Sequence, residues 1–153
     1  MMNSKSGENF SVANVGSFSE LDEFTFEAAN LPLKVQGKVF LKELLSLTSA
    51  EISFNSIPPG KSIPFYHKHR FNEEIYIFIR GAGEFQVDNV VFPVTEGTVV
   101  RVDCEGERCW RNTSDADLHC ITIQARAGSF PNHTIQDGLK VERAVSWEEK
   151  TRV

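Results

Sequence analysis

Residues 65–81 read FYHKHRFNEEIYIFIRG, and this stretch gathers two of the four histidines of the chain beside a pair of glutamates. One residue separates His67 from His69, so on an extended chain both side chains point to the same side. Beyond the glutamates, bulky apolar residues occupy both alternating positions up to Gly81. This pattern predicts a strand that is covered on both faces and that the histidines enter from one end.

The same alternation places Glu74 on one face with Tyr76 and Phe78, near or inside an apolar interior. A buried carboxylate without a partner is costly, by several kcal/mol or more. Two imidazoles and one carboxylate that converge on a cavity suit a divalent ion, with iron, manganese, zinc, nickel and copper all compatible. The alternative is a chance His-x-His in a solvated loop, and the spacing alone leaves both interpretations open.

Short segments with strand patterns follow one another from about residue 33, separated by turn signals. One of them, 83–94, predicts a hairpin that turns at Asp88-Asn89. Only residues 40–47 have helical spacing, and a strand is an equally open interpretation there. The strand segments are 50–57, 67–81, 83–94, 98–103, 108–112 and 118–126. Many short strands at close spacing predict an all-β sandwich or barrel.

Composition narrows the classes of function. The chain has 153 residues, enough for one domain with its own core, and a net charge of −5 without a long Lys/Arg run. We therefore expect no nucleic acid and no anionic membrane surface as partner. The first 16 residues are polar and do not resemble a signal peptide, and no segment approaches the length of a membrane span. Three cysteines, an odd number, indicate reduced thiols and a cytoplasmic location.

The spacing around the histidines resembles the first conserved motif of the cupins. That motif has a glycine, a spacer, His-x-His, a glutamate after three or four residues, and a glycine six residues further on. In this chain its places are filled by Gly60, His67, His69, Glu74 and Gly81. The resemblance spans about residues 45–126. It implies a small jelly-roll β-barrel of two antiparallel sheets, with a metal held inside by the two histidines, the glutamate and a histidine of a second motif.

The second motif lacks its histidine in this sequence. Residues 97–112 read GTVVRVDCEGERCWRN, and either Arg108 or Cys109 takes the histidine position, depending on how the motif is aligned. Trp110 should face the core, and Arg108 shares its parity. We therefore favour Arg108, and expect Cys109 to face outward.

An arginine at this position leaves three alternatives, because a guanidinium stays protonated and does not bind metals. Arg108 grips an anionic ligand beside a metal held by three residues, or it pairs with Glu74 in a site without metal. In the third alternative His119 supplies the missing ligand, although a histidine at such a position is more often packed in the core. Tyr76 is a further candidate for ligand binding through its hydroxyl.

We expect three segments: an N-terminal leader with dimer contacts (1–32), a barrel (33–126) and a C-terminal extension (127–153). The resemblance implies a small cytoplasmic protein that binds a divalent metal and a small organic ligand, such as a metal-dependent dioxygenase or isomerase. The alternative is a non-catalytic binding or sensor protein with a degenerate metal site. A homodimer is expected in either case.

Overall fold

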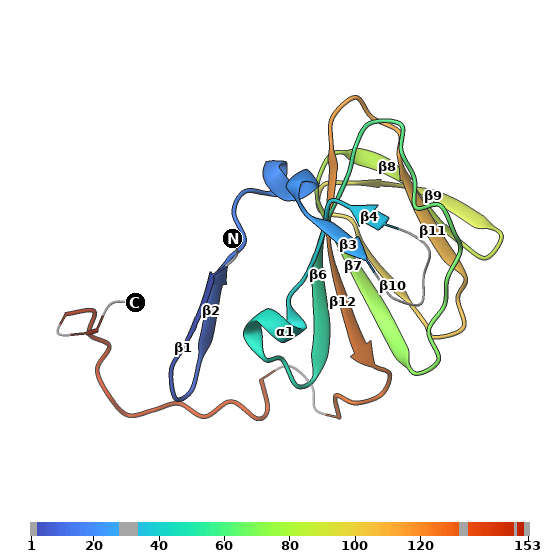
Figure 1. Cartoon of the computed structure of the whole chain (residues 1–153). Coiled ribbons are helices and arrows are strands. Elements are labelled where there is room, and N and C mark those ends of the chain that lie inside the picture. Colours follow the sequence, from blue (N-terminus) through green and yellow to red (C-terminus); the bar gives the residue numbers. More distant parts are fainter. Residues whose placement is uncertain (1–2, 28–33, 132–134, 149, 152–153) are drawn as a thin grey trace.

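The structure of the protein is a computed structural model that describes residues 3–27, 34–131, 135–148 and 150–151 (Figure 1). It is mostly β, as predicted, and its strands form a larger and a smaller sheet and two short strand pairs. The strands are β1 (Asn3–Ser6), β2 (Ser11–Asn14), β3 (Thr25–Glu27), β4 (Lys34–Gln36), β5 (Lys38–Phe40), β6 (Ala50–Ile57), β7 (Asn72–Arg80), β8 (Ala82–Val87), β9 (Val90–Thr95), β10 (Val99–Val102), β11 (Arg108–Asn112) and β12 (Leu118–Arg126).

The larger sheet has the order β10-β7-β12-β6-β5, and the smaller one has the order β11-β8-β9. All pairs are antiparallel, and β12 lies between β7 and β6 at the centre. Figure 1 shows the two sheets facing each other. Strand β7 continues through Gly81 into β8. The described strands leave the two sheets open to each other rather than closed into one hydrogen-bonded barrel.

The main core lies between the two sheets and is rich in aromatic rings. Tyr76 and Phe78 of β7 meet residues of the opposite sheet, with ring centroids 4.8 Å apart for Tyr76 and Phe85 and 5.5 Å apart for Phe78 and Trp110. All four side chains are buried. The alternation of β7 therefore points Glu74, Tyr76 and Phe78 to the inside, as the sequence predicts.

A second apolar cluster covers the outer face of the larger sheet. The 3-10 helix η1 (Phe18–Glu23) places Leu21, which is fully buried, against Val39 and Leu41. Ser17 and Glu20 form a capping box at the start of this helix. The segment that we expected as a leader thus contains the β1–β2 hairpin and a helix that seals one face of the sheet. The expected boundary at residues 32 and 33 lies outside the described residues.

Two turns agree with the sequence. The β8–β9 hairpin turns at Asp88-Asn89, with Asp88 in the left-handed region at φ 52°. Gly81, between β7 and β8, has φ 84°, and a Cβ there would lie 2.5 Å from the carbonyl oxygen of Asp117. Residues 40–47 contain a single short helix, α1 (Lys42–Leu45).

The C-terminal segment beyond β12 runs along the molecule without regular structure in its described residues. Several of its apolar side chains are exposed, including Leu139 at 91% and Trp147 at 79%. The described part of the chain contains no helix of the length and apolar character that crossing a bilayer requires.

Candidate metal centre

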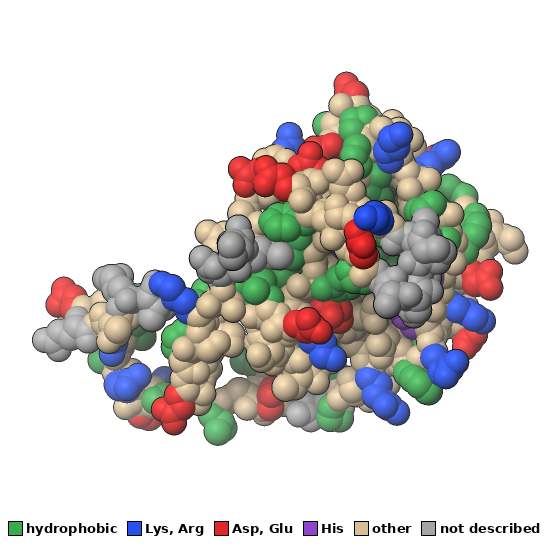
Figure 2. Space-filling view, viewed as in Figure 1, with side chains coloured by type: hydrophobic (Ala, Val, Ile, Leu, Met, Phe, Trp, Pro, Cys, Tyr) green, Lys and Arg blue, Asp and Glu red, His purple; other side chains and the backbone are tan. Residues whose placement is uncertain are grey.

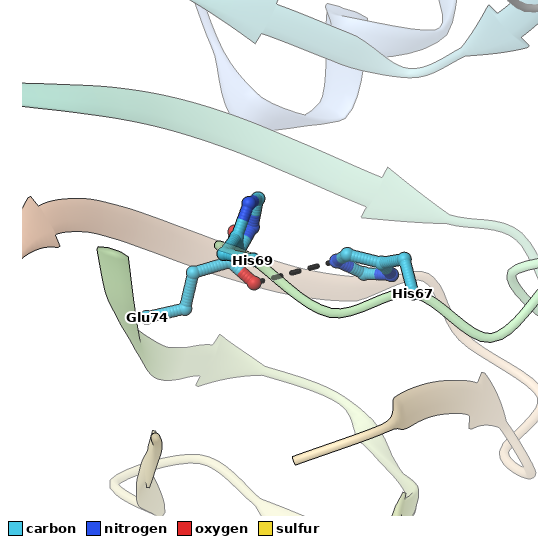
Figure 3. A group of neighbouring side chains, drawn as sticks. All are labelled: His67, His69 and Glu74. Atoms are coloured by element: carbon cyan, nitrogen blue, oxygen red, sulfur yellow. Dashed lines mark hydrogen bonds and ion pairs between the residues drawn. The ribbon is translucent and has the colours of Figure 1, made fainter. Parts of the chain in front are cut away.

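The histidines lie on the segment that leads into β7, and backbone hydrogen bonds fix this segment to the second sheet. His67 and Arg108 exchange backbone hydrogen bonds, with N–O distances of 3.3 and 3.1 Å. The amide of His69 donates to the carbonyl oxygen of Cys104 at 3.1 Å. The alternation of an extended chain then turns both imidazoles toward Glu74 on β7 (Figure 3).

The three side chains converge on one point. The Nε2 atom of His67 lies 3.3 Å from Oε2 of Glu74, and the Nε2 atom of His69 lies 3.1 Å from Oε1. Their ligand atoms all lie within 4.8 Å of one another. Among the described residues, this is the group of His, Cys, Asp or Glu side chains that could hold a metal ion. Glu74 is buried and the two histidines are partly exposed. Figure 2 shows a small area of histidine atoms at the molecular surface.

The donor set fits a divalent metal. An ion bound at roughly 2.1 Å separates neighbouring ligand atoms by about 3.0–3.4 Å, depending on the coordination angle. The two nitrogen–oxygen distances to Glu74 fall in this range. In addition, Nδ1 of His67 is buried without a hydrogen-bond partner among the described residues, and Nε2 of His69, although 3.1 Å from Oε1 of Glu74, makes no contact of regular hydrogen-bond geometry. Nε2 of His69 therefore faces the carboxylate of Glu74 in a geometry that suits a shared metal ion better than a direct hydrogen bond.

Arg108 lies between the two sheets, as predicted, with none of its surface exposed. Its Nε and Nη2 atoms donate to Oε2 of Glu74 at 3.0 and 2.8 Å, and Nη1 donates to the carbonyl oxygen of Gly106 at 2.8 Å. The ion pair of the second alternative is therefore present. It engages one oxygen of Glu74, while the other oxygen faces His69.

Contacts with charged and polar groups keep Glu74 ionised. Burial by itself raises the pKa of this carboxyl, but contacts with His67, His69, Tyr76 and Arg108 together hold the pKa well below its usual range. The hydroxyl of Tyr76 donates to Oε2 of Glu74. Burial, with the negative charge of Glu74, raises the pKa of Tyr76, so this hydroxyl stays protonated as a donor.

Two other sequence candidates lie elsewhere. His119, on β12, packs against Phe18 of η1 with ring centroids 5.5 Å apart, on the outer face of the sheet. Cys109 is partly exposed, and its Sγ atom donates to the carbonyl oxygen of Ile63. Neither residue belongs to the group around Glu74, while Tyr76 contacts it directly.

Gln124 is a site residue that sequence reasoning missed. It is the cross-strand partner of Glu74 on β12, and its Nε2 atom donates to Oε1 of Glu74 at 3.2 Å. Asn72 in turn donates to Gln124 at 3.1 Å. The available signal was a polar residue within an apolar strand. The sequence could not show that Gln124 lies beside Glu74, because that depends on which strands pair.

The fold and the site define a class: small double-sheet β proteins with a two-histidine, one-glutamate group in the interior. A family model described as a cupin domain matches residues 54–124. The solved structure of a cupin protein from Bacteroides fragilis is 33% identical in sequence, covers 76% of this chain and 94% of its own, and superposes with a TM-score of 0.66. The chain belongs to the cupin superfamily.

Other similar structures have more specific descriptions. A predicted oxalate decarboxylase from Thermotoga maritima is 25% identical, and the alignment covers 74% of this chain and 99% of that one with a TM-score of 0.58. A putative sugar phosphate isomerase from Acidithiobacillus ferrooxidans is 27% identical over 58% of each chain, with a TM-score of 0.54. No curated protein matches the sequence.

Proposed function

We propose that this cupin binds a divalent metal through His67, His69 and Glu74 and a small organic ligand beside it. The observation that carries the proposal is the convergence of two imidazoles and one carboxylate within 4.8 Å. A bound divalent ion supplies Lewis acidity or, for a redox metal, activation of oxygen. Three protein ligands leave coordination positions for the organic ligand.

The remaining residues of the site position the metal ligands. Arg108 and Tyr76 hold Oε2 of Glu74, and Gln124 donates to Oε1, so the carboxylate has a fixed orientation. Fixed orientation of a ligating carboxylate raises the affinity of a metal site. The arginine also reduces the negative charge of the site, and we therefore expect weaker metal binding than in a site with a fourth neutral ligand.

Metal-dependent decarboxylation, isomerisation and dioxygenation are the reaction classes that we propose to test. The similar structures described as an oxalate decarboxylase and a sugar phosphate isomerase support a small, oxygen-rich anionic ligand. Fold alone does not fix the chemistry. We further propose a cytoplasmic location and a homodimer, the latter because of the exposed apolar residues of the C-terminal segment.

Metal analysis of protein purified without an affinity tag tests the metal site. We expect close to one divalent ion per chain in the wild type and less than a tenth of that in His67→Ala. His119→Gln is the matched control, because it removes a buried histidine outside the group, and it should retain the metal. Equal metal contents in wild type and His67→Ala contradict the proposal.

A non-catalytic binding protein is the second candidate, favoured by the Arg108–Glu74 ion pair. In this function the ion pair is structural, and the protein binds a ligand without turning it over. Oxygen uptake and product analysis on a panel of small carboxylates, with Mn²⁺ or Fe²⁺ added, separate the two. Turnover that is lost in His69→Ala supports the metal-dependent enzyme, and binding without turnover supports the second candidate.

A further inference from the structure

A cavity of about 860 Å³, a typical volume for a small-molecule site, is lined by Gln124, a neighbour of Glu74, although none of the three candidate metal ligands lines it. Three phenylalanines, Phe24, Phe26 and Phe40, form its apolar wall, and Gln124 and Asn72 line it on the side of Glu74. The amide of Gln124 donates to Oε1 of Glu74, so a ligand in this cavity is one side chain away from the proposed metal.

Lys38 places a positive charge on the inner wall of this cavity. The neighbouring residue Val39 is buried in the outer apolar cluster, so alternation turns Lys38 and Phe40 to the inner face. The Cα partner of Lys38 is Asn55, whose side chain donates to Thr122 on the same inner face. Lys38 therefore shares its face of the sheet with Gln124 and Glu74.

The ammonium group of Lys38 lacks a carboxylate partner in the described structure. The contact that it makes is with the ring of Phe40, whose centroid lies 4.8 Å from Nζ. Burial lowers the pKa of Lys38, against the charge of Glu74, which raises it. Charged side chains that lose water without gaining a partner are costly, and at a ligand cavity the missing partner is commonly the ligand.

Other charged groups also line the cavity, among them Lys42, Glu51 and Arg126. Oε1 of Glu51 accepts from the backbone amide of Lys42 at 2.9 Å, and the guanidinium of Arg126 lies over the ring of Phe71. Arg108, the anion-binding residue expected from the sequence, gives its donors to Glu74 and Gly106. Of the three cations that line the cavity, Lys38 is partly buried, whereas Lys42 and Arg126 are exposed to solvent.

We infer that Lys38 and the phenylalanine wall select a small aromatic carboxylate, with its carboxylate on Nζ of Lys38 and its ring against Phe40. A planar ring matches a wall of aromatic side chains, and a carboxylate matches an unpaired ammonium. The inference deepens the proposed function, because it names the class of the organic ligand. Lys38 acts in it as a binding residue that sets specificity.

Binding of benzoate and of its neutral counterpart benzamide, measured by isothermal titration or ligand-observed NMR, tests this inference. The full chain is used both metal-free and with Mn²⁺. We expect benzoate to bind the wild type at least tenfold more tightly than benzamide. Lys38→Met should abolish this preference and Lys38→Arg should keep it, which also separates charge from any effect on folding.

Two further variants serve as controls. Lys61→Met removes an exposed lysine that lies outside this cavity, and it should keep the preference for benzoate. Phe40→Leu should weaken benzoate and benzamide by the same factor, since it removes the shared ring contact. The inference is overturned if the wild type binds both probes within twofold or binds neither, or if Lys38→Met keeps the preference or Lys61→Met loses it equally.

These experiments distinguish a failure of the metal proposal from a failure of this inference. If His67→Ala loses its metal but Lys38→Met still prefers benzoate, the metal site stands and the role of Lys38 is wrong. If the wild type holds no metal but metal-free protein prefers benzoate through Lys38, the metal proposal is wrong and the ligand class stands. Metal content measured on Lys38→Met should equal that of the wild type.

Discussion

At the scale of single residues, the chemistry of the site depends on what surrounds the carboxylate of Glu74. This side chain is 4% exposed and has Arg108, Tyr76, Gln124 and the two histidines as neighbours. A buried charge is tolerable only with such partners. Arg108, which we favour for the histidine position of the second cupin motif, compensates a negative charge that a metal would otherwise compensate alone.

Removal of the guanidinium should leave Glu74 buried and without its main counter-charge. We expect Arg108→Met to lower the free energy of unfolding of metal-free protein by about 3–5 kcal/mol, measured by urea denaturation. The double variant Arg108→Met/Glu74→Gln removes both charges and should cost less than the sum of the single variants. Additive effects would show that the ion pair contributes nothing to stability.

We expect His119 to give the protein a pH-dependent stability that is independent of the metal ligands. It is 2% exposed, and burial lowers its pKa, with Asp117 opposing and Arg80 adding to the shift. The unfolded chain therefore takes up a proton at His119 near pH 6.5, whereas the folded chain takes it up only at a lower pH. Stability from this residue is present above about pH 6.5 and is lost as the pH falls toward the lower pKa of the folded state.

We accordingly expect the urea midpoint of the wild type to fall more between pH 7.5 and 5.5 than that of His119→Phe. Phenylalanine keeps the ring packed on Phe18 but takes up no proton. His67 and His69 are present in both proteins and cancel in the comparison. An identical pH dependence for the two proteins would show that His119 is not held neutral by the fold.

At the scale of secondary structure, the turn between β7 and β8 fixes how the site strand connects to the opposite sheet. Gly81 has φ 84°, a conformation that side chains disfavour, and a Cβ there would lie 2.5 Å from the carbonyl oxygen of Asp117. Gly97 has the same φ of 84° but open space at its Cβ position. An alanine at position 97 therefore tests backbone strain alone, and an alanine at position 81 tests backbone strain together with a steric clash.

Gly97→Ala should cost about 1–2 kcal/mol, the penalty of the left-handed conformation alone. Gly81→Ala should cost clearly more, because the added methyl group must also displace the backbone at Asp117. Thermal unfolding of the two variants measures the difference. If both alanine variants have the same stability, the close approach at Gly81 does not constrain the fold.

Sequence reasoning was strongest for features that are local to one element. The alternation of β7 predicted the inward direction of Glu74 and Tyr76, and the parity of Trp110 predicted that of Arg108. The same rule could not find Gln124 or Lys38, because their importance depends on which strands are neighbours. The helix η1 was missed although Ser17 and Glu20 form a recognisable capping box, because polar neighbours made the segment resemble a leader.

At the scale of the whole molecule, the C-terminal segment has a strand-like pattern without a described strand partner. Leu139, Val141, Val145 and Trp147 all occupy odd positions and are at least 73% exposed. Such a one-sided apolar pattern is typical of a half-buried strand, and exposed apolar patches are typical of interaction sites. We propose that this segment packs on a second copy of the chain.

The double variant Leu139→Glu/Val141→Glu should therefore shift the protein from dimer to monomer in size-exclusion chromatography with light scattering. Lys140→Glu/Glu142→Lys, which changes the other face of the same segment, is the matched control and should remain dimeric. A monomeric wild type, or a dimer that survives the first double variant, contradicts this role of the segment.

The most direct test of the central claim is an anomalous difference map from crystals of the wild type soaked in Mn²⁺, recorded where manganese scatters anomalously. The account predicts one strong peak bounded by Nε2 of His67, Nε2 of His69 and the carboxylate of Glu74. A map without a peak at that point, or with its main peak elsewhere in the chain, would contradict it.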